Sequence, residues 1–130
     1  MLKIERLSPV IGAEVSGANL ISPNDDEFKE LEQALSEYSV LFFRDQPRLS
    51  PKQQVAFATQ FGPLHSHPAA PVLEDDEAIF VIKTDANSKV ANGNGWHTDV
   101  SCDNEPPLVT MLQLHQLPET GGDTSFSSMY

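Results

Sequence analysis

The 130-residue sequence is poor in cysteine, in positive charge and in long hydrophobic runs, and each shortage excludes a class of protein. Cys102 is the only cysteine, so no disulfide can form within the chain. Only 8 Lys and Arg stand against 19 Asp and Glu, and the net charge of −11 argues against a nucleic acid or an anionic membrane surface as partner. No segment reaches the ~20 apolar residues of a membrane span, and the first ten residues lack the apolar stretch of a secretory signal. We therefore expect a cytoplasmic protein.

The residues that are present are typical of a folded, loop-rich chain. Apolar residues make up 39% of the sequence, and ten prolines are spread along it. The length suits one domain with a single hydrophobic core. Neither an internal repeat nor a linker between domains is evident, so one domain over residues 1–130 is predicted.

The first half of the chain contains the helix signals. Asn24 and Glu27 have the spacing of a capping box, and apolar residues at helical spacing then predict an amphipathic helix over 25–38. Its apolar positions are Phe28, Leu31, Leu35 and Tyr38.

A second helix is predicted to begin after Ser50, because Pro51 suits the first helical position and Gln53 completes another capping box. The Gly62-Pro63 pair should end this helix. Its expected buried side consists of Val55, Ala58 and Phe61.

Short alternating or apolar segments predict the strands. They are residues 2–7, 39–44, 78–83, 96–101, 108–117 and 123–127. Because helices come early and strands late, the pattern predicts an α+β fold with an antiparallel β core. The last strand would leave an unpaired sheet edge, which natural proteins usually protect, so the architecture is expected to be incomplete at its C-terminus.

The most informative stretch is NGWHTDVS, residues 94–101. In a strand, the side chains of His97 and Asp99 would point the same way, one pleat apart, and could bind one cation. They would form two thirds of a 2-His-1-carboxylate triad, which holds Fe(II) and leaves positions open for substrate and O₂. By the same alternation, Trp96 and Cys102 face the other way and are expected to be packed inside.

A bare H-x-D occurs by chance in many proteins and alone predicts little. The motif also does not identify the third metal ligand. His115 is the only histidine after Asp99, and on the predicted strand 108–117 it is more simply a packed or exposed side chain.

Other segments make the motif more specific. Pro-Pro at 106–107 and LPETGGDT at 117–124 follow WHTDVS, while VSGANL at 15–20, VLFFRDQ at 40–46 and QFGPLHSHP at 60–68 precede it. In this order, and over nearly the whole chain, these segments resemble the taurine/2-oxoglutarate-dependent (TauD/TfdA-type) non-haem iron dioxygenase family.

The resemblance implies a double-stranded β-helix (a cupin-like jelly roll) with flanking helices, of which residues 1–130 would be the N-terminal portion. It implies Fe(II) as cofactor and 2-oxoglutarate as co-substrate, with O₂ and a small anionic organic substrate. By position, His97 and Asp99 would be catalytic iron ligands, and Thr124 would bind 2-oxoglutarate. His67 and Asn94 would contact the substrate.

Three departures from the family pattern matter. Ala70 and Gly93 stand where taurine-using members carry Tyr and Asn, and the loss of polar contacts of this kind changes selectivity strongly. A different sulfonate, a sulfate ester or a carboxylate is therefore at least as good a candidate as taurine. The family's second iron-binding His and its 2-oxoglutarate-binding Arg lie downstream of GGDT, beyond Tyr130, so the 130-residue chain alone is expected to be inactive.

Three hypotheses stay open. The first is an Fe(II)/2-oxoglutarate dioxygenase represented by its N-terminal part. The second is a truncated, non-catalytic fragment that serves as a binding or assembly module and borrows strands from another chain, for example in a homo-oligomer. The third is a small cupin-like metal protein that uses His115 as a ligand.

Overall fold

The computed structural model describes residues 1–66, 79–89, 93 and 95–130. They form two compact units. The first unit consists of Met1–Leu49 and Gln113–Tyr130, and the second consists of Ser50–Leu112. In this part of the chain, no helix is both long and apolar enough to cross a bilayer.

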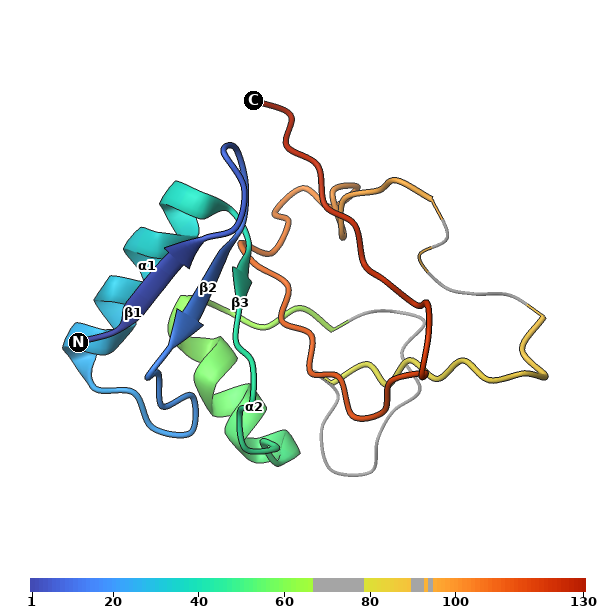
Figure 1. The fold of residues 1–130 in the computed structure, drawn as a ribbon, viewed down its shortest axis with the longest axis horizontal. Helices are drawn as coiled ribbons and strands as arrows, with labels where there is room; N and C mark the ends of the chain where they lie inside the picture. The colour runs from blue at the N-terminus through green and yellow to red at the C-terminus, as the bar shows by residue number, and fades with distance from the viewer. Residues whose placement is uncertain (67–78, 90–92, 94) are drawn as a thin grey trace. The chain divides into compact units, whose positions relative to one another are not determined.

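A small sheet forms the centre of the first unit (Figure 1). Its strands β1 (Lys3–Arg6), β2 (Ala13–Ser16) and β3 (Leu41–Phe42) lie in the order β1-β2-β3. β1 and β2 form an antiparallel hairpin, whereas β2 and β3 are parallel. The predicted strand at 2–7 is therefore confirmed, the one at 39–44 is shortened to Leu41–Phe42, and β2 was not predicted.

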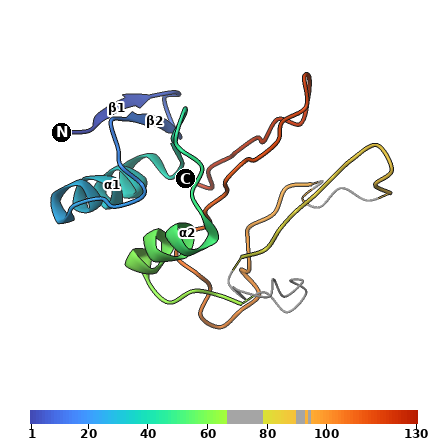
Figure 2. The same cartoon turned by 90° about the horizontal axis from the view of Figure 1, so that it is seen from below.

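The helix α1 (Asp25–Tyr38) runs along one face of this sheet, as Figure 2 shows. Leu31 and Ala34 of α1 are buried, as are Ala13 and Val15 of β2. Removal of these apolar side chains from water is the main favourable contribution to packing between a helix and a sheet. The predicted apolar face is thus confirmed in part: Leu31 is buried, whereas Phe28, Leu35 and Tyr38 are half-buried, and Ala34 was not predicted.

The ends of α1 follow the sequence signals. The Asn24 side chain accepts hydrogen bonds from the backbone N–H groups of Asp26 (3.1 Å) and Glu27 (2.9 Å). The Glu27 carboxylate in turn accepts one from the Asn24 N–H (3.1 Å), which completes the predicted capping box. At the other end Ser39 adopts a left-handed conformation (φ 63°), which turns the chain into β3.

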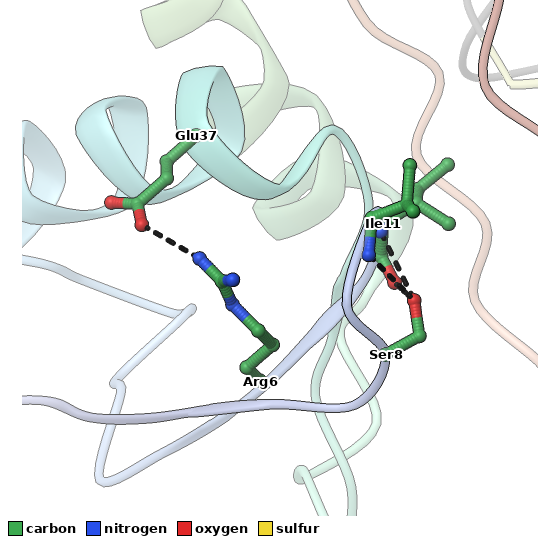
Figure 3. Close-up of polar contacts among 5 residues, drawn as sticks. Arg6, Ser8, Ile11 and Glu37 are labelled. Carbon is green, nitrogen blue, oxygen red and sulfur yellow. Dashed lines mark hydrogen bonds and ion pairs between the residues drawn. The ribbon is translucent and has the colours of Figure 1, made fainter. Parts of the chain in front are cut away.

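A cation joins β1 to the C-terminal turn of α1. The Arg6 guanidinium extends toward the carboxylate of Glu37, 3.3 Å away (Figure 3), and lies 5.3 Å from the centre of the Tyr38 ring. In the turn after β1, the Ser8 hydroxyl accepts a hydrogen bond from the Ile11 N–H (3.0 Å). These contacts fix the hairpin and α1 at the same end of the sheet.

The second unit begins with α2 (Pro51–Ala58), which continues as the 3₁₀ turn η1 (Thr59–Phe61). Ser50 and Gln53 form the predicted capping box, and Gly62 ends the helical run with φ 139°. The predicted buried side is corrected: Phe57 is buried, whereas Val55, Ala58 and Phe61 are only half-buried.

The later strand predictions are wrong for the described residues. Segments without a strand are 79–83, 96–101, 108–117 and 123–127, and residue 78 lies outside the described part. Alternation of apolar and polar residues shows that one side of a segment can pack against an apolar surface. A strand forms only where another backbone satisfies its N–H and C=O groups. The side chains Leu108, Leu112, Leu114 and Leu117 are accordingly exposed.

The end of the chain runs back along the segment that contains β3, through contacts of side chains. The Gln113 carboxamide accepts a hydrogen bond from the Leu49 N–H (2.7 Å) and donates one to the Leu49 carbonyl (3.1 Å). Further along, the rings of Phe42 and Phe126 meet edge to face, with centroids 5.8 Å apart. Residues 113–126 therefore lie beside 42–49 in antiparallel direction.

Candidate metal centre

His97 and Asp99 lie close together in the second unit, at the start of a turn over residues 99–102. His97 Nε2 is 3.3 Å from Asp99 Oδ1. The prediction that a strand would place them one pleat apart is wrong, because no strand forms there. The turn brings them together instead, with Val100 in the left-handed region (φ 52°).

The hydrogen bond made by His97 Nδ1 determines whether Nε2 presents a lone pair. Nδ1 lies 2.8 Å from the carbonyl oxygen of Gly95. A carbonyl only accepts hydrogen bonds, so Nδ1 carries the proton, and in the neutral ring Nε2 presents its lone pair. Histidines that bind metals usually have this arrangement, with the other ring N–H donated to a carbonyl or carboxylate.

The lone pair of Nε2 and a carboxylate oxygen of Asp99 lie 3.3 Å apart, so one metal ion could bind both atoms. One imidazole nitrogen and one carboxylate oxygen are ligands that suit Fe(II). Both side chains are exposed, so the pair is accessible from solvent. The residues present therefore fit the metal that the sequence predicted.

A third ligand is not found in the described part of the chain, where no group of three or more His, Cys, Asp or Glu side chains could hold a metal ion. His115 belongs to the first unit, and its Nδ1 lies 3.0 Å from the Arg48 guanidinium. Because arginine only donates, this nitrogen is the acceptor. Its lone pair is occupied and a cation lies beside it, which disfavours His115 as a metal ligand.

The other predicted residues are distributed as follows. Thr124 is exposed in the first unit, and its role toward 2-oxoglutarate stays a prediction. His67 and Asn94 lie outside the described residues. Trp96 and Cys102, expected inside, are both exposed, because the turn replaces the strand whose alternation would have buried them.

Gly93, which the family resemblance had singled out, lies beside His97. Gly93 has φ +80°, and a Cβ there would lie 3.5 Å from His97 Cε1. In addition, His65 Nε2 lies 2.8 Å from Asp103 Oδ2. The sequence reasoning missed this contact: His65 belongs to the quoted segment QFGPLHSHP, and Asp103 lies between the predicted strands 96–101 and 108–117.

Comparisons with known proteins identify the family of this chain. The family model described as "Taurine catabolism dioxygenase TauD, TfdA family" matches residues 3–130. The chain belongs to this family. An alkylsulfatase from Acinetobacter baylyi is 38% identical over 98% of the chain and 39% of its own length.

A second curated relative and a solved structure support the same family. An alpha-ketoglutarate-dependent sulfate ester dioxygenase from Pseudomonas putida is 32% identical over 98% of this chain and 42% of its own length. A solved taurine dioxygenase from Burkholderia xenovorans superposes with a TM-score of 0.67 at 33% identity, covering 81% of this chain and 37% of the other. This TauD/TfdA chain therefore spans about two fifths of the length of these relatives. Enzymes of the family use Fe(II) and 2-oxoglutarate.

Proposed function

We propose that His97 and Asp99 provide two of the three protein ligands of Fe(II) in a 2-oxoglutarate-dependent dioxygenase. The hydrogen bond from His97 Nδ1 to the Gly95 carbonyl is the observation that carries the proposal, because it turns the lone pair of Nε2 toward Asp99. Family membership supplies the identity of the metal. The same membership supports a jelly roll for the complete domain, of which this chain would be the N-terminal portion.

The proposed reaction hydroxylates a C–H bond of the substrate. One O₂ is consumed, one of its oxygen atoms enters the new C–OH group, and the other enters succinate as 2-oxoglutarate loses CO₂. Bound Fe(II) supplies the activation of O₂. His97 and Asp99 would hold the metal, and the family resemblance assigns Thr124 to a 2-oxoglutarate carboxylate and His67 and Asn94 to the substrate.

We propose a small anionic substrate, namely a sulfonate, a sulfate ester or a carboxylate. The relatives support this class: their names include a sulfate ester dioxygenase, a sulfonate dioxygenase and a phenoxypropionate dioxygenase. Gly93, beside His97, offers no side chain to the site, which argues against taurine. A cytoplasmic location remains a prediction of the sequence.

We further propose that residues 1–130 alone do not turn over, because the described residues offer two ligands for the metal. The alternative is a non-catalytic fragment that acts as a binding or assembly module, in which a homo-oligomer could supply the missing strands. Leu108 and Leu112 of the second unit are exposed, as are Leu114 and Leu117 of the first, so each unit has apolar surface that a partner segment could cover.

Succinate formation from 2-oxoglutarate tests the enzyme proposal. The complete protein is supplied with Fe(II), O₂ and a panel of sulfonates, sulfate esters and carboxylates, and succinate is quantified. We expect turnover that needs Fe(II), is abolished in Asp99→Ala and is unchanged in the matched control His115→Ala. Full turnover in Asp99→Ala would refute the ligand assignment, and loss in His115→Ala would favour the small cupin-like alternative.

A further inference from the structure

The turn that carries Asp99 is strained and must be held. Val100 has φ 52°, a conformation that is unfavourable for a β-branched residue. The hydrogen bond from the Asp103 N–H to the Val100 carbonyl (3.1 Å) closes the turn. Strained backbone of this kind persists only where its surroundings enforce it, and it concentrates at functional sites.

Asp103 also reaches away from the turn. Its Oδ2 lies 2.8 Å from Nε2 of His65, which follows η1 and lies in the same unit. The His65 side chain is only 25% exposed, so this contact is better shielded from water than the surface ion pairs of the chain. It persists with a neutral or a charged imidazole, because Nε2–H can donate to the carboxylate in both forms.

These contacts form a continuous connection from the helical segment to the metal pair. His65 follows α2 and η1 in the chain and contacts the Asp103 carboxylate. The Asp103 N–H in turn donates to the carbonyl of Val100, the residue next to Asp99. Asp103 therefore links the segment after η1 to the turn that presents the Asp99 carboxylate to His97.

We propose that His65 and Asp103 form a positioning pair that holds the Asp99 turn in the geometry needed for metal binding. This inference rests on the proposed metal site at His97 and Asp99. Neither residue touches the metal in this assignment. They act through the turn, as supporting residues around a metal site usually do.

Binding of Co(II) alone to the complete protein, followed by its visible absorption, tests the proposal. The spectrum reports ligand geometry, and the titration gives affinity without any turnover. Loss of a supporting residue typically weakens metal binding 10–100-fold, and we expect about tenfold for Asp103→Ala, with an altered spectrum. Asp103→Asn keeps an acceptor for the His65 N–H and should recover most of the affinity. Glu119→Ala, which removes an exposed carboxylate in the first unit, should bind as the wild type does.

Two variants of His65 cover the case in which Asp103→Ala does not fold. His65→Gln keeps a side-chain donor and should bind nearly normally, whereas His65→Ala should be about tenfold weaker. Wild-type affinity and spectrum in His65→Ala and Asp103→Ala would overturn the positioning pair and leave the metal site standing. A wild-type protein that binds no Co(II) would overturn the metal site, and the pair with it.

Discussion

At the scale of single residues, one backbone carbonyl determines the chemistry of His97. The Gly95 carbonyl accepts a hydrogen bond from Nδ1–H, so Nε2 is the nitrogen available to a metal and it faces Asp99. A metal ligand must present a lone pair, and the hydrogen bond at Nδ1 leaves the lone pair of Nε2 available for this.

Gly93 is a second residue whose identity the site constrains. With φ +80°, any L side chain there is strained, by roughly 1–2 kcal/mol on general grounds. We predict that Gly93→Ala lowers the free energy of unfolding by about 1 kcal/mol, measured by urea denaturation. Gly93→Asn should cost less, because asparagine tolerates this conformation. Equal stability of glycine and alanine would contradict the assigned backbone conformation.

At the scale of elements, helix caps are the features best specified by local sequence. The Asn24 side chain satisfies backbone N–H groups at the start of α1, and α1 provides part of the core of the first unit. We predict that Asn24→Ala lowers the free energy of unfolding by about 1 kcal/mol. Asn24→Ser keeps an acceptor and serves as the control. A loss of the same size in both variants would show that the cap is not the cause.

The contact between Gln113 and Leu49 provides a separate test in the first unit. One carboxamide satisfies both backbone groups of Leu49, whose side chain is buried. Because a buried backbone group without a partner costs about 1–3 kcal/mol, Gln113→Ala should accelerate hydrogen exchange at the Leu49 amide by tenfold or more. The exposed neighbour Gln116 offers the matched control, Gln116→Ala. Unchanged protection in Gln113→Ala would contradict this contact.

The elements also show which structure could be predicted from sequence. Both helices were predicted because capping boxes and apolar spacing act within a few residues. β2 was missed because its four residues become a strand only between β1 and β3. The predicted strand at 96–101 failed for a related reason: the turn at Val100 depends on Asp103 and His65, and the sequence does not show that these residues meet.

The proximity of His97 and Asp99 was predicted correctly, whereas their role as metal ligands stays a prediction. His97 and Asp99 were identified from their chemistry and family resemblance, and they do lie together. The geometry that joins them was wrong, and so were the expected positions of Trp96 and Cys102. Residue types carry chemical identity, whereas orientation depends on backbone contacts that are distant in sequence.

At the scale of the whole molecule, negative charge is the dominant electrostatic feature. With a net charge of −11, self-repulsion opposes the compact state. The ion pairs that join Arg6 to Glu37 and Arg44 to Glu14 offset little of it, because they are exposed. Glu14 does raise the pKa of Arg44, through its hydrogen bond and its charge, so this cation is retained at every accessible pH.

Salt should therefore stabilise the protein. Raising NaCl from about 20 mM to about 200 mM shortens the screening length to below about 10 Å and weakens the repulsion among carboxylates more than it weakens the few ion pairs. We predict a higher melting temperature in the higher salt, measured by circular dichroism. A lower melting temperature would mean that attractive pairs dominate.

The most direct test of the central claim is to locate a bound paramagnetic ion in solution. Mn(II) is titrated into the isotope-labelled complete protein, and the broadening of nuclear magnetic resonance signals is followed residue by residue. We predict that the ring signals of His97 and the backbone signals around Asp99 broaden first, at the lowest Mn(II). Broadening that begins at the acidic start of α1, around Asp25 and Asp26, or at His115, and spares His97, would contradict the proposed metal site.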